Sequence, residues 1–344
     1  MRVAILGRTR MLLNTGWKLA SAGHTIPLVG TCREAPEYGV GVGDFRAFAE
    51  DVGAVFFDDH RINAPEVTAL LRNVDADIAV SVNWLTVIGH EAIAAFGRGI
   101  LNAHSGDLPR YRGNACSNWV LLNGERQITL TVHFMDPESL DSGPIVLKRH
   151  RPLETETTIG EIYDWLETTA PEMFLEAVNG LEAGTLCPVP QNEDPLASLR
   201  CYPRIPSDSL LDWKQGAVSL MRLVKASSRP FAGAYTHWQG RKLVVWDARA
   251  DSYPCPSLAV PGQVLWRDGT TGNVGVATGD GVLVLRVVQW EGEEKRFAAE
   301  VLRSTRARLG FVLDDEVAGL LSGMRNVEER LTEIETALRR LGAG

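Results

Sequence analysis

Short apolar runs and segments of helical periodicity alternate along the first half of the chain. The apolar runs lie at 3–6, 25–29, 54–57 and 78–82, and an amphipathic pattern at 12–20 follows the first of them. Runs of this length indicate buried strands, and strands that alternate with helices indicate βαβ units. The pattern therefore predicts an α/β fold with a doubly wound, mainly parallel, Rossmann-like sheet.

The pattern changes near residue 187. Residues 187–206 contain five prolines and little periodicity, which predicts an interdomain linker. A helical pattern at 211–226 precedes short strands at close spacing, and Gly-Asp-Gly at 279–281 is a hairpin signal. We therefore expect a first domain at 1–200 and a small OB-like β-barrel domain at 207–300. The expected strands of the second domain are 234–238, 242–246, 262–266, 274–278 and 281–288.

The last segment, 312–342, has apolar residues at alternating steps of three and four, with Glu and Arg between them. These residues are Val317, Leu320, Met324, Val327, Leu331, Ile334, Leu338 and Leu341. This spacing is typical of a coiled-coil seam and predicts a homodimer through the C-terminal helix. A single amphipathic helix that packs on its own domain is the alternative, and the sequence leaves both open.

Composition narrows the class of protein. The chain carries 35 Lys and Arg against 43 Asp and Glu, a formal charge of −8, which disfavours a nucleic-acid partner. No apolar run approaches the roughly 20 residues that cross a bilayer, so we expect a cytoplasmic protein without a membrane partner. Five cysteines without C-x-x-C spacing disfavour a disulfide framework and a structural zinc site. One glycine at 7–12, where a dinucleotide fingerprint needs three, disfavours a nucleotide-binding oxidoreductase.

The densest chemical signal lies at 99–146. Asn102 and His104 are two residues apart on a predicted strand, so both face the same side. A second strand, near 131–134, leads to a loop that carries Asp141. Together these residues suit acyl transfer to an amine: His104 accepts the proton of the attacking nitrogen, Asp141 orients the imidazole, and Asn102 donates a hydrogen bond to the oxyanion.

Other interpretations of these residues remain open. His104 could be a satisfied structural histidine, and Asp141 could cap a turn. His133 alternates with apolar neighbours, which favours packing over catalysis. A metal site is not expected, because no pair of histidines has ligand spacing, and no G-x-S-x-G elbow supplies a nucleophile. A nucleophilic role for Cys116 is disfavoured, because small thiols are common packing residues.

Several motifs occur together in this region: N-x-H at 102–104, L-P-x-Y-x-G at 108–113, T-V-H-x-M-D at 131–136 and L-D-x-G-P-I at 140–145. The combination resembles the formyltransferase family that uses 10-formyltetrahydrofolate, and Asn102, His104 and Asp141 fall on its catalytic positions. The resemblance covers roughly residues 1–303, including a C-terminal barrel similar to that of methionyl-tRNA formyltransferases.

The resemblance also implies where the folate binds. In family members the pterin is held largely by backbone groups of two loops, which correspond here to 83–88 and 136–141. The residues expected at the cofactor are Trp84, Leu85, Val87, Asp136 and Leu140.

The sequence determines the acceptor amine less well than the formyl donor. Asp107 and the acidic stretch at 34–60 are unfavourable for an RNA acceptor stem. Arg110, Tyr111 and Arg112 offer two guanidinium groups and an aromatic ring, which suit a diphosphate and a sugar or base ring. We therefore expect a nucleotide-linked amino sugar, as in the related sugar N-formyltransferases of surface-polysaccharide (lipopolysaccharide O-antigen) pathways.

Methionyl-tRNA is the alternative acceptor, and retention of the C-terminal domain favours it. A glycinamide-ribonucleotide formyltransferase is a single domain and leaves 207–344 unexplained. A non-catalytic scaffold is a third possibility, and it predicts that Asn102, His104 and Asp141 do not converge in space.

Overall fold

The computed structural model describes residues 1–35, 38–252, 258–310 and 313–341. The chain forms two compact units, the first made of Met1–Asp208 with Lys225–Ala232, and the second of Ser209–Val224 with Gly233–Gly344. The predicted domain boundary at 200–207 lies beside this division. The segment Lys225–Ala232 joins the first unit, where Asn118 Nδ2 donates to the Ala226 carbonyl at 2.8 Å.

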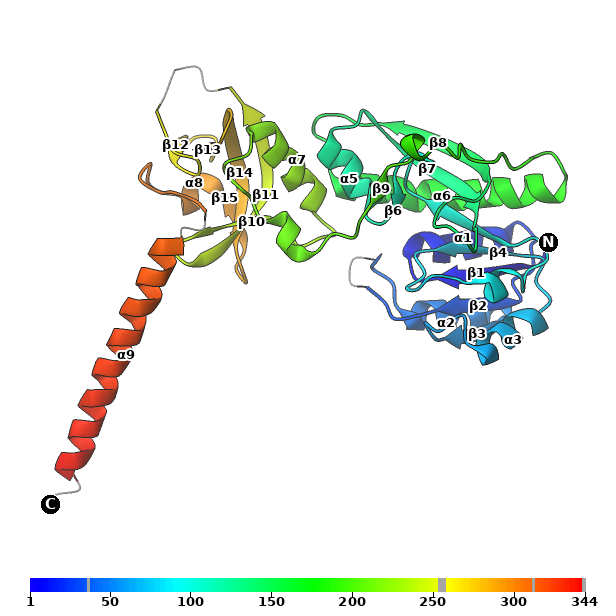
Figure 1. The fold of residues 1–344 in the computed structure, drawn as a ribbon, viewed down its shortest axis with the longest axis horizontal. Helices are drawn as coiled ribbons and strands as arrows, with labels where there is room; N and C mark the ends of the chain where they lie inside the picture. The colour runs from blue at the N-terminus through cyan, green and yellow to red at the C-terminus, as the bar shows by residue number, and fades with distance from the viewer. Residues whose placement is uncertain (36–37, 253–257, 311–312, 342–344) are drawn as a thin grey trace. The chain divides into compact units, whose positions relative to one another are not determined.

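The first unit is built on a seven-stranded sheet with the order β3-β2-β1-β4-β5-β7-β8 (Figure 1). The first five strands run parallel, whereas β7 and β8 are antiparallel to their neighbours. The expected mainly parallel α/β sheet is therefore confirmed. Its strands are β1 (Val3–Gly7), β2 (Leu28–Thr31), β3 (Val55–Asp58), β4 (Ile78–Val82), β5 (Ile100–His104), β7 (Gln127–Phe134) and β8 (Ile145–Pro152).

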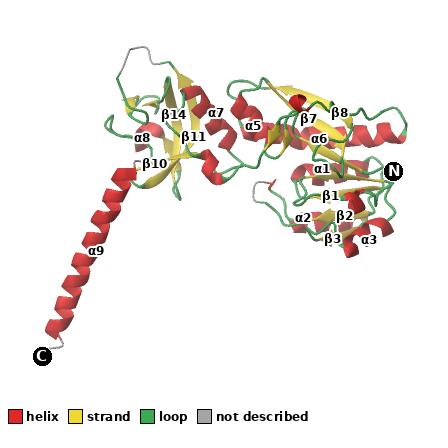
Figure 2. Ribbon diagram, viewed as in Figure 1, coloured by secondary structure: helices red, strands yellow, loops and turns green. Residues whose placement is uncertain are grey.

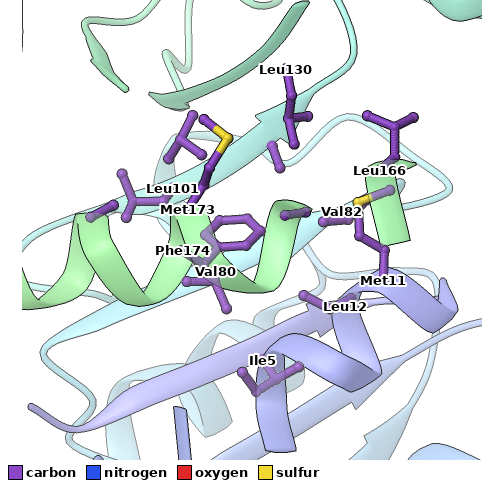
Figure 3. Packing of buried hydrophobic residues seen from close by; sticks show 14 of the residues in the cluster. Ile5, Met11, Leu12, Val80, Val82, Leu101, Leu130, Leu166, Met173 and Phe174 are labelled. Carbon is purple, nitrogen blue, oxygen red and sulfur yellow. The ribbon is translucent and has the colours of Figure 1, made fainter. Parts of the chain in front are cut away.

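Helices of the first unit pack on this sheet, and two of them begin at side-chain caps. Thr9 caps α1, and Thr158 forms a capping box with Glu161 at the start of α6. In Figure 3 Phe174 and Met173 of α6 lie against Val80 and Leu101 of the central strands. The helices are α1 (Arg10–Ser21), α2 (Val42–Val52), α3 (Pro65–Asn73), α4 (His90–Ile93), α5 (Cys116–Asn123) and α6 (Ile159–Glu182).

The proline-rich stretch 187–206 is more than a connector. Its strand β9 (Arg200–Cys201) pairs in parallel with β6 (Arg112–Gly113), and both lie in the first unit. Two 3-10 turns, Pro195–Ala197 and Pro206–Ser209, complete it. The linker interpretation is therefore wrong for much of this stretch, since prolines here rigidify chain that packs on the first unit.

The second unit contains a six-stranded antiparallel sheet of order β10-β11-β14-β13-β12, with β15 on β14 (Figure 2). Helix α7 (Ala217–Ser227) begins later than the predicted 211, because Leu211 N and Ala217 N donate to carbonyls of Tyr235 and Asp280 instead. The strands are β10 (Ala234–Trp238), β11 (Arg241–Asp251), β12 (Val264–Arg267), β13 (Val274–Ala277), β14 (Val282–Trp290) and β15 (Lys295–Phe297), followed by α8 (Ala298–Val301).

The predicted C-terminal helix is present as α9 (Leu313–Leu341). Its apolar residues Met324, Val327, Leu331 and Ile334 are each more than half exposed, so they do not pack on the described part of the chain. Across the described residues, no helix is both long and apolar enough to cross a membrane.

Candidate active site

Three neighbouring strands place polar side chains in one row across the first sheet. Asn102 on β5 is paired with Ser81 on β4 and with His133 on β7, and His104 is paired with Thr131. Paired residues project to the same face, and residues two apart on a strand do the same. Asn102 and His104 therefore share a face, as their spacing predicts.

Asp141 reaches this face from the loop between β7 and β8. Its backbone has a positive φ of 53°, and its Oδ2 accepts a hydrogen bond from Gly113 N at 2.8 Å. Gly143 leaves no room for a side chain, because a Cβ there would lie 2.0 Å from the Phe134 carbonyl oxygen. The tight return of this loop brings the carboxylate next to the end of β5.

The histidine and the carboxylate then meet. His104 Nδ1 lies 3.6 Å from Asp141 Oδ2, and both side chains are more than nine-tenths buried. On the opposite side of the ring, His104 Nε2 lies 2.6 Å from the Tyr111 carbonyl oxygen. A carbonyl oxygen only accepts, so Nε2 carries the hydrogen of the neutral ring, and Nδ1, beside the Asp141 carboxylate, is the nitrogen that can take up a second proton.

His133 orients the side chain of Asn102, the third of the predicted catalytic residues. Its Nδ1 lies 2.7 Å from the Phe134 carbonyl, which only accepts, so Nδ1 carries the hydrogen and Nε2 is an acceptor. Asn102 Nδ2 lies 3.1 Å from that Nε2 and donates to it. Burial, and then the charge of His104, lower the pKa of His133 to about 4. A neutral His133 therefore orients the Asn102 amide. The sequence did not predict this role, because the alternation of His133 with apolar neighbours favours packing.

Asp141 is also held from the stretch predicted to be a linker. Gln191 Nε2 donates to the carbonyls of Asp141 and Gly143, both at 2.8 Å, and Gln191 Oε1 accepts from Arg112 at 2.8 Å. No sequence signal marked Gln191, because a glutamine between prolines matches no periodic pattern.

The predicted folate residues lie at the ends of β4 and β7. Leu85, Val87 and Leu140 are apolar yet 41–71% exposed, which leaves them free to cover an apolar ligand. Trp84 packs on the core beside Phe57, with ring centroids 6.0 Å apart. Asp136 bonds within its own loop, where it accepts from Glu138 N and from Ser142 Oγ.

The predicted acceptor residues differ from expectation at Tyr111. Its side chain is 2% exposed and its hydroxyl donates to Glu125 at 2.6 Å. Burial and this hydrogen bond raise the pKa of Tyr111 to about 12. The ring therefore packs inside the protein and does not stack on a substrate, which corrects the prediction.

The two arginines beside Tyr111 lie differently. Arg110 pairs with Glu125 at 3.1 Å while more than half of its side chain stays exposed. Arg112 bonds Gln191, and its Nε is buried without a hydrogen-bond partner. Arg110 is therefore the more accessible of the two guanidinium groups.

Two further side chains bear on the chemistry. A hydrogen bond with Cys201, together with burial, raises the pKa of the Cys116 thiol far above its ordinary range, so it is a poor nucleophile. Asp107 accepts from Lys148 Nζ at 2.7 Å. Because the Lys148 ammonium offsets the negative charge of Asp107, this carboxylate repels RNA less than the sequence alone predicts.

Comparison with known proteins identifies the family. The formyl transferase family profile matches residues 32–178, and the profile of the formyl transferase C-terminal domain matches residues 205–306. A methionyl-tRNA formyltransferase of Symbiobacterium thermophilum is 31% identical over 75% of this chain and 77% of its own. The chain belongs to the formyl transferase family. The expected resemblance is thus confirmed, and the protein is an N-formyltransferase.

Solved structures of other proteins share the fold. The N-formyltransferase from Helicobacter canadensis, in complex with folinic acid and dTDP-3-aminofucose, has a TM-score of 0.60 and 14% identity, and the match covers 86% of this chain and 100% of that one. HypX from Aquifex aeolicus, in complex with tetrahydrofolic acid, has a TM-score of 0.58 and 20% identity over 89% of this chain. This chain spans about half of HypX, 47% of its length.

Proposed function

We propose that this formyltransferase transfers the formyl group of 10-formyltetrahydrofolate to the amine of a nucleotide-linked amino sugar. The observation that carries the chemistry is the convergence of Asn102, His104 and Asp141 on one face of the sheet, with His104 Nδ1 3.6 Å from Asp141 Oδ2. A non-catalytic scaffold has no need of this convergence.

The reaction follows from these groups. The neutral amine attacks the formyl carbon, and the carbonyl oxygen becomes an oxyanion that accepts a hydrogen bond from the Asn102 amide. His104 Nδ1 takes the proton of the amine, and the resulting imidazolium donates to the Tyr111 carbonyl through Nε2 and is stabilised by the charge of Asp141, whose Oδ2 lies 3.6 Å from Nδ1. The bond between the formyl carbon and N10 then breaks, and a proton returns to N10. No covalent enzyme intermediate is needed, in keeping with a buried Cys116.

The donor would lie against the exposed apolar residues at the carboxyl edge of the sheet. Leu85 and Val87 follow β4, the strand that pairs with β5, and Leu140 directly precedes Asp141. All three exposed apolar residues therefore belong to segments that adjoin the proposed catalytic residues. Ligands of open α/β sheets bind outside the carboxyl ends of the strands. The folate bound to HypX and to the Helicobacter enzyme supports the same donor here.

Charge supports a small acceptor at this site. Residues 1–208 carry 27 Asp and Glu against 17 Lys and Arg, and a negative field of this kind disfavours an RNA acceptor stem. The half-exposed Arg110 offers a guanidinium group to a diphosphate. The dTDP-3-aminofucose bound to the Helicobacter enzyme is an acceptor of this class.

A specific observation favours methionyl-tRNA as the second candidate. Residues 209–224 and 233–310, the second unit without its C-terminal helix, carry 12 Lys and Arg against 9 Asp and Glu, the opposite balance to the first unit. The matched C-terminal domain and the name of the Symbiobacterium relative point the same way. The excess of Lys and Arg in this part of the second unit would serve to hold the phosphates of a tRNA.

An acceptor panel tests the proposal. The protein is incubated with 10-formyltetrahydrofolate and with nucleotide-linked 3-amino and 4-amino sugars in separate reactions, and release of tetrahydrofolate and the mass of each acceptor are measured. We expect formylation of at least one sugar. Turnover with methionyl-tRNA alone would contradict the proposed acceptor, and His104→Asn should lower turnover with every acceptor by about 10²–10⁴-fold.

The reaction is placed in the cytoplasm as part of the same proposal. Cys32, Cys116, Cys187 and Cys201 are free thiols, which suits a reducing compartment.

We also propose that the chain self-associates through α9, as its apolar spacing predicts.

A further inference from the structure

Helix α9 carries an apolar stripe that the described part of the chain leaves uncovered. Met324, Val327, Leu331 and Ile334 follow one another at steps of three, four and three, and they are 61, 58, 54 and 55% exposed. We call these four residues the C-terminal seam. They occupy alternating a and d positions of a heptad repeat, with Met324 and Leu331 at a and Val327 and Ile334 at d.

The residues around the seam are polar. In the same repeat, Arg325, Glu329, Thr332 and Thr336 occupy outer positions of the helix. A helix of 29 residues is about 43 Å long at 1.5 Å per residue, and a stripe of apolar residues along it is buried in stable proteins. The seam is therefore shaped for a long helical partner with the same repeat.

Charged residues beside the C-terminal seam indicate that the partner is a second copy of α9 and that the two helices run parallel. Glu328 and Glu335 occupy e positions and Arg330 occupies a g position. In a parallel pair of identical helices, g of one heptad faces e′ of the next heptad in the partner, so Arg330 meets Glu335 of the second copy. In an antiparallel pair, e faces e′ and g faces g′, so glutamates meet glutamates and Arg330 meets Arg330. Only the parallel arrangement pairs opposite charges.

We infer that α9 binds α9 of a second copy of this chain as a parallel, in-register coiled coil. The inference specifies an orientation that apolar spacing alone does not, and it is independent of which amine the enzyme formylates. In a parallel pair the two helices begin at the same end, so the two second units that precede them in the chain lie at one end of the coiled coil.

Cysteine cross-linking tests the direction. In the full-length protein Val327→Cys and Ile334→Cys are made separately, and each is oxidised with a mild disulfide reagent. In a parallel, in-register pair each d position meets its own copy, so both variants form covalent dimers. An antiparallel pair brings at most one of these positions to its own copy, and cross-linking of only one would overturn the inference. Glu329→Cys, at an outer position, is the matched control and should stay uncross-linked beyond the wild-type level.

The charge pair has its own test. Light scattering measures the mass in solution of wild type, Arg330→Glu, Glu335→Arg and the double variant that exchanges both charges. We expect each single variant to dissociate at protein concentrations at least several-fold higher than wild type, and the exchange to restore association. Leu331→Asp should give the mass of one chain, whereas Thr332→Asp should not change the mass. A wild-type mass of one chain, or an exchange that fails to restore association, would overturn the inference.

Discussion

At the scale of single residues, the proposed chemistry depends on an amide and an imidazole held by neighbours that have no catalytic contact of their own. Asn102 is oriented by His133, and His104 lies between Asp141 Oδ2 and the Tyr111 carbonyl. Preorganised donors of this kind stabilise developing charge without rearrangement during the reaction.

The first prediction concerns the base. We expect His104→Asn to lower kcat by about 10²–10⁴-fold, the range typical of losing a general base, with little change in the melting temperature. Steady-state kinetics and thermal unfolding measure the two effects. His90→Asn, an exposed histidine of α4, is the control, and wild-type turnover in the His104 variant would contradict the assignment.

The second prediction concerns His133 and pH. Its pKa is about 4 in the folded protein, below the value of about 6.5 in an unfolded chain, so the unfolded state binds the proton more tightly. Stability from this group is therefore full above pH 6.5 and is lost as the pH falls towards 4, by up to about 3 kcal/mol. Urea unfolding between pH 4 and 7 should show a shallower dependence in His133→Gln. An unchanged slope would contradict the buried neutral state.

At the scale of elements, a short stretch of irregular chain positions the carboxylate of Asp141, the proposed partner of His104. Gln191 joins the carbonyls of Asp141 and Gly143, and β9 pairs with β6, whose Gly113 N donates to Asp141. The site is thus assembled from two strand ends and a segment 50 residues further along the chain.

The third prediction tests this support. We expect Gln191→Ala to lower kcat by about 10-fold or more, because displacement of a catalytic group by about 1 Å can cost 10²-fold. Gln191→Glu should behave alike, since it keeps the acceptor for Arg112 and loses the donor to both carbonyls. Asn192→Ala is the neighbouring exposed control. Normal turnover in both Gln191 variants would show that the loop holds its own shape.

The elements that sequence could predict are those with a periodic apolar pattern. The run at 78–82 corresponds to β4, and the pattern at 12–20 lies within α1. The start of α7 was misplaced because Leu211 is apolar yet bonds the sheet through its backbone, which periodicity does not report. Tyr111 was expected at the substrate for a similar reason: nothing local shows that Glu125, 14 residues later, binds its hydroxyl inside the core.

At the scale of the whole molecule, the two units differ in charge. The first unit is acidic, whereas the second unit without its C-terminal helix carries a small excess of Lys and Arg, so electrostatics favours a small acceptor at the site and a polyanion on that part of the second unit. These tendencies separate the two candidate functions, because binding that neutralises many phosphates weakens steeply with salt.

The fourth prediction uses that dependence. Between 50 and 200 mM salt, kcat/KM for a nucleotide-linked amino sugar should fall by less than about tenfold, because few phosphates are contacted. A fall of about 10³-fold for a methionyl-tRNA reaction would indicate a broad phosphate interface on the second unit.

The most direct test of the proposed function is a comparison of kcat/KM for a nucleotide-linked amino sugar and for methionyl-tRNA, measured with the same enzyme, donor and salt concentration. We predict a value at least about 10²-fold higher for the sugar, with both activities at least about 10²-fold lower in His104→Asn. A higher value for methionyl-tRNA would contradict the proposed acceptor, and activity that persists in the variant would contradict the proposed base.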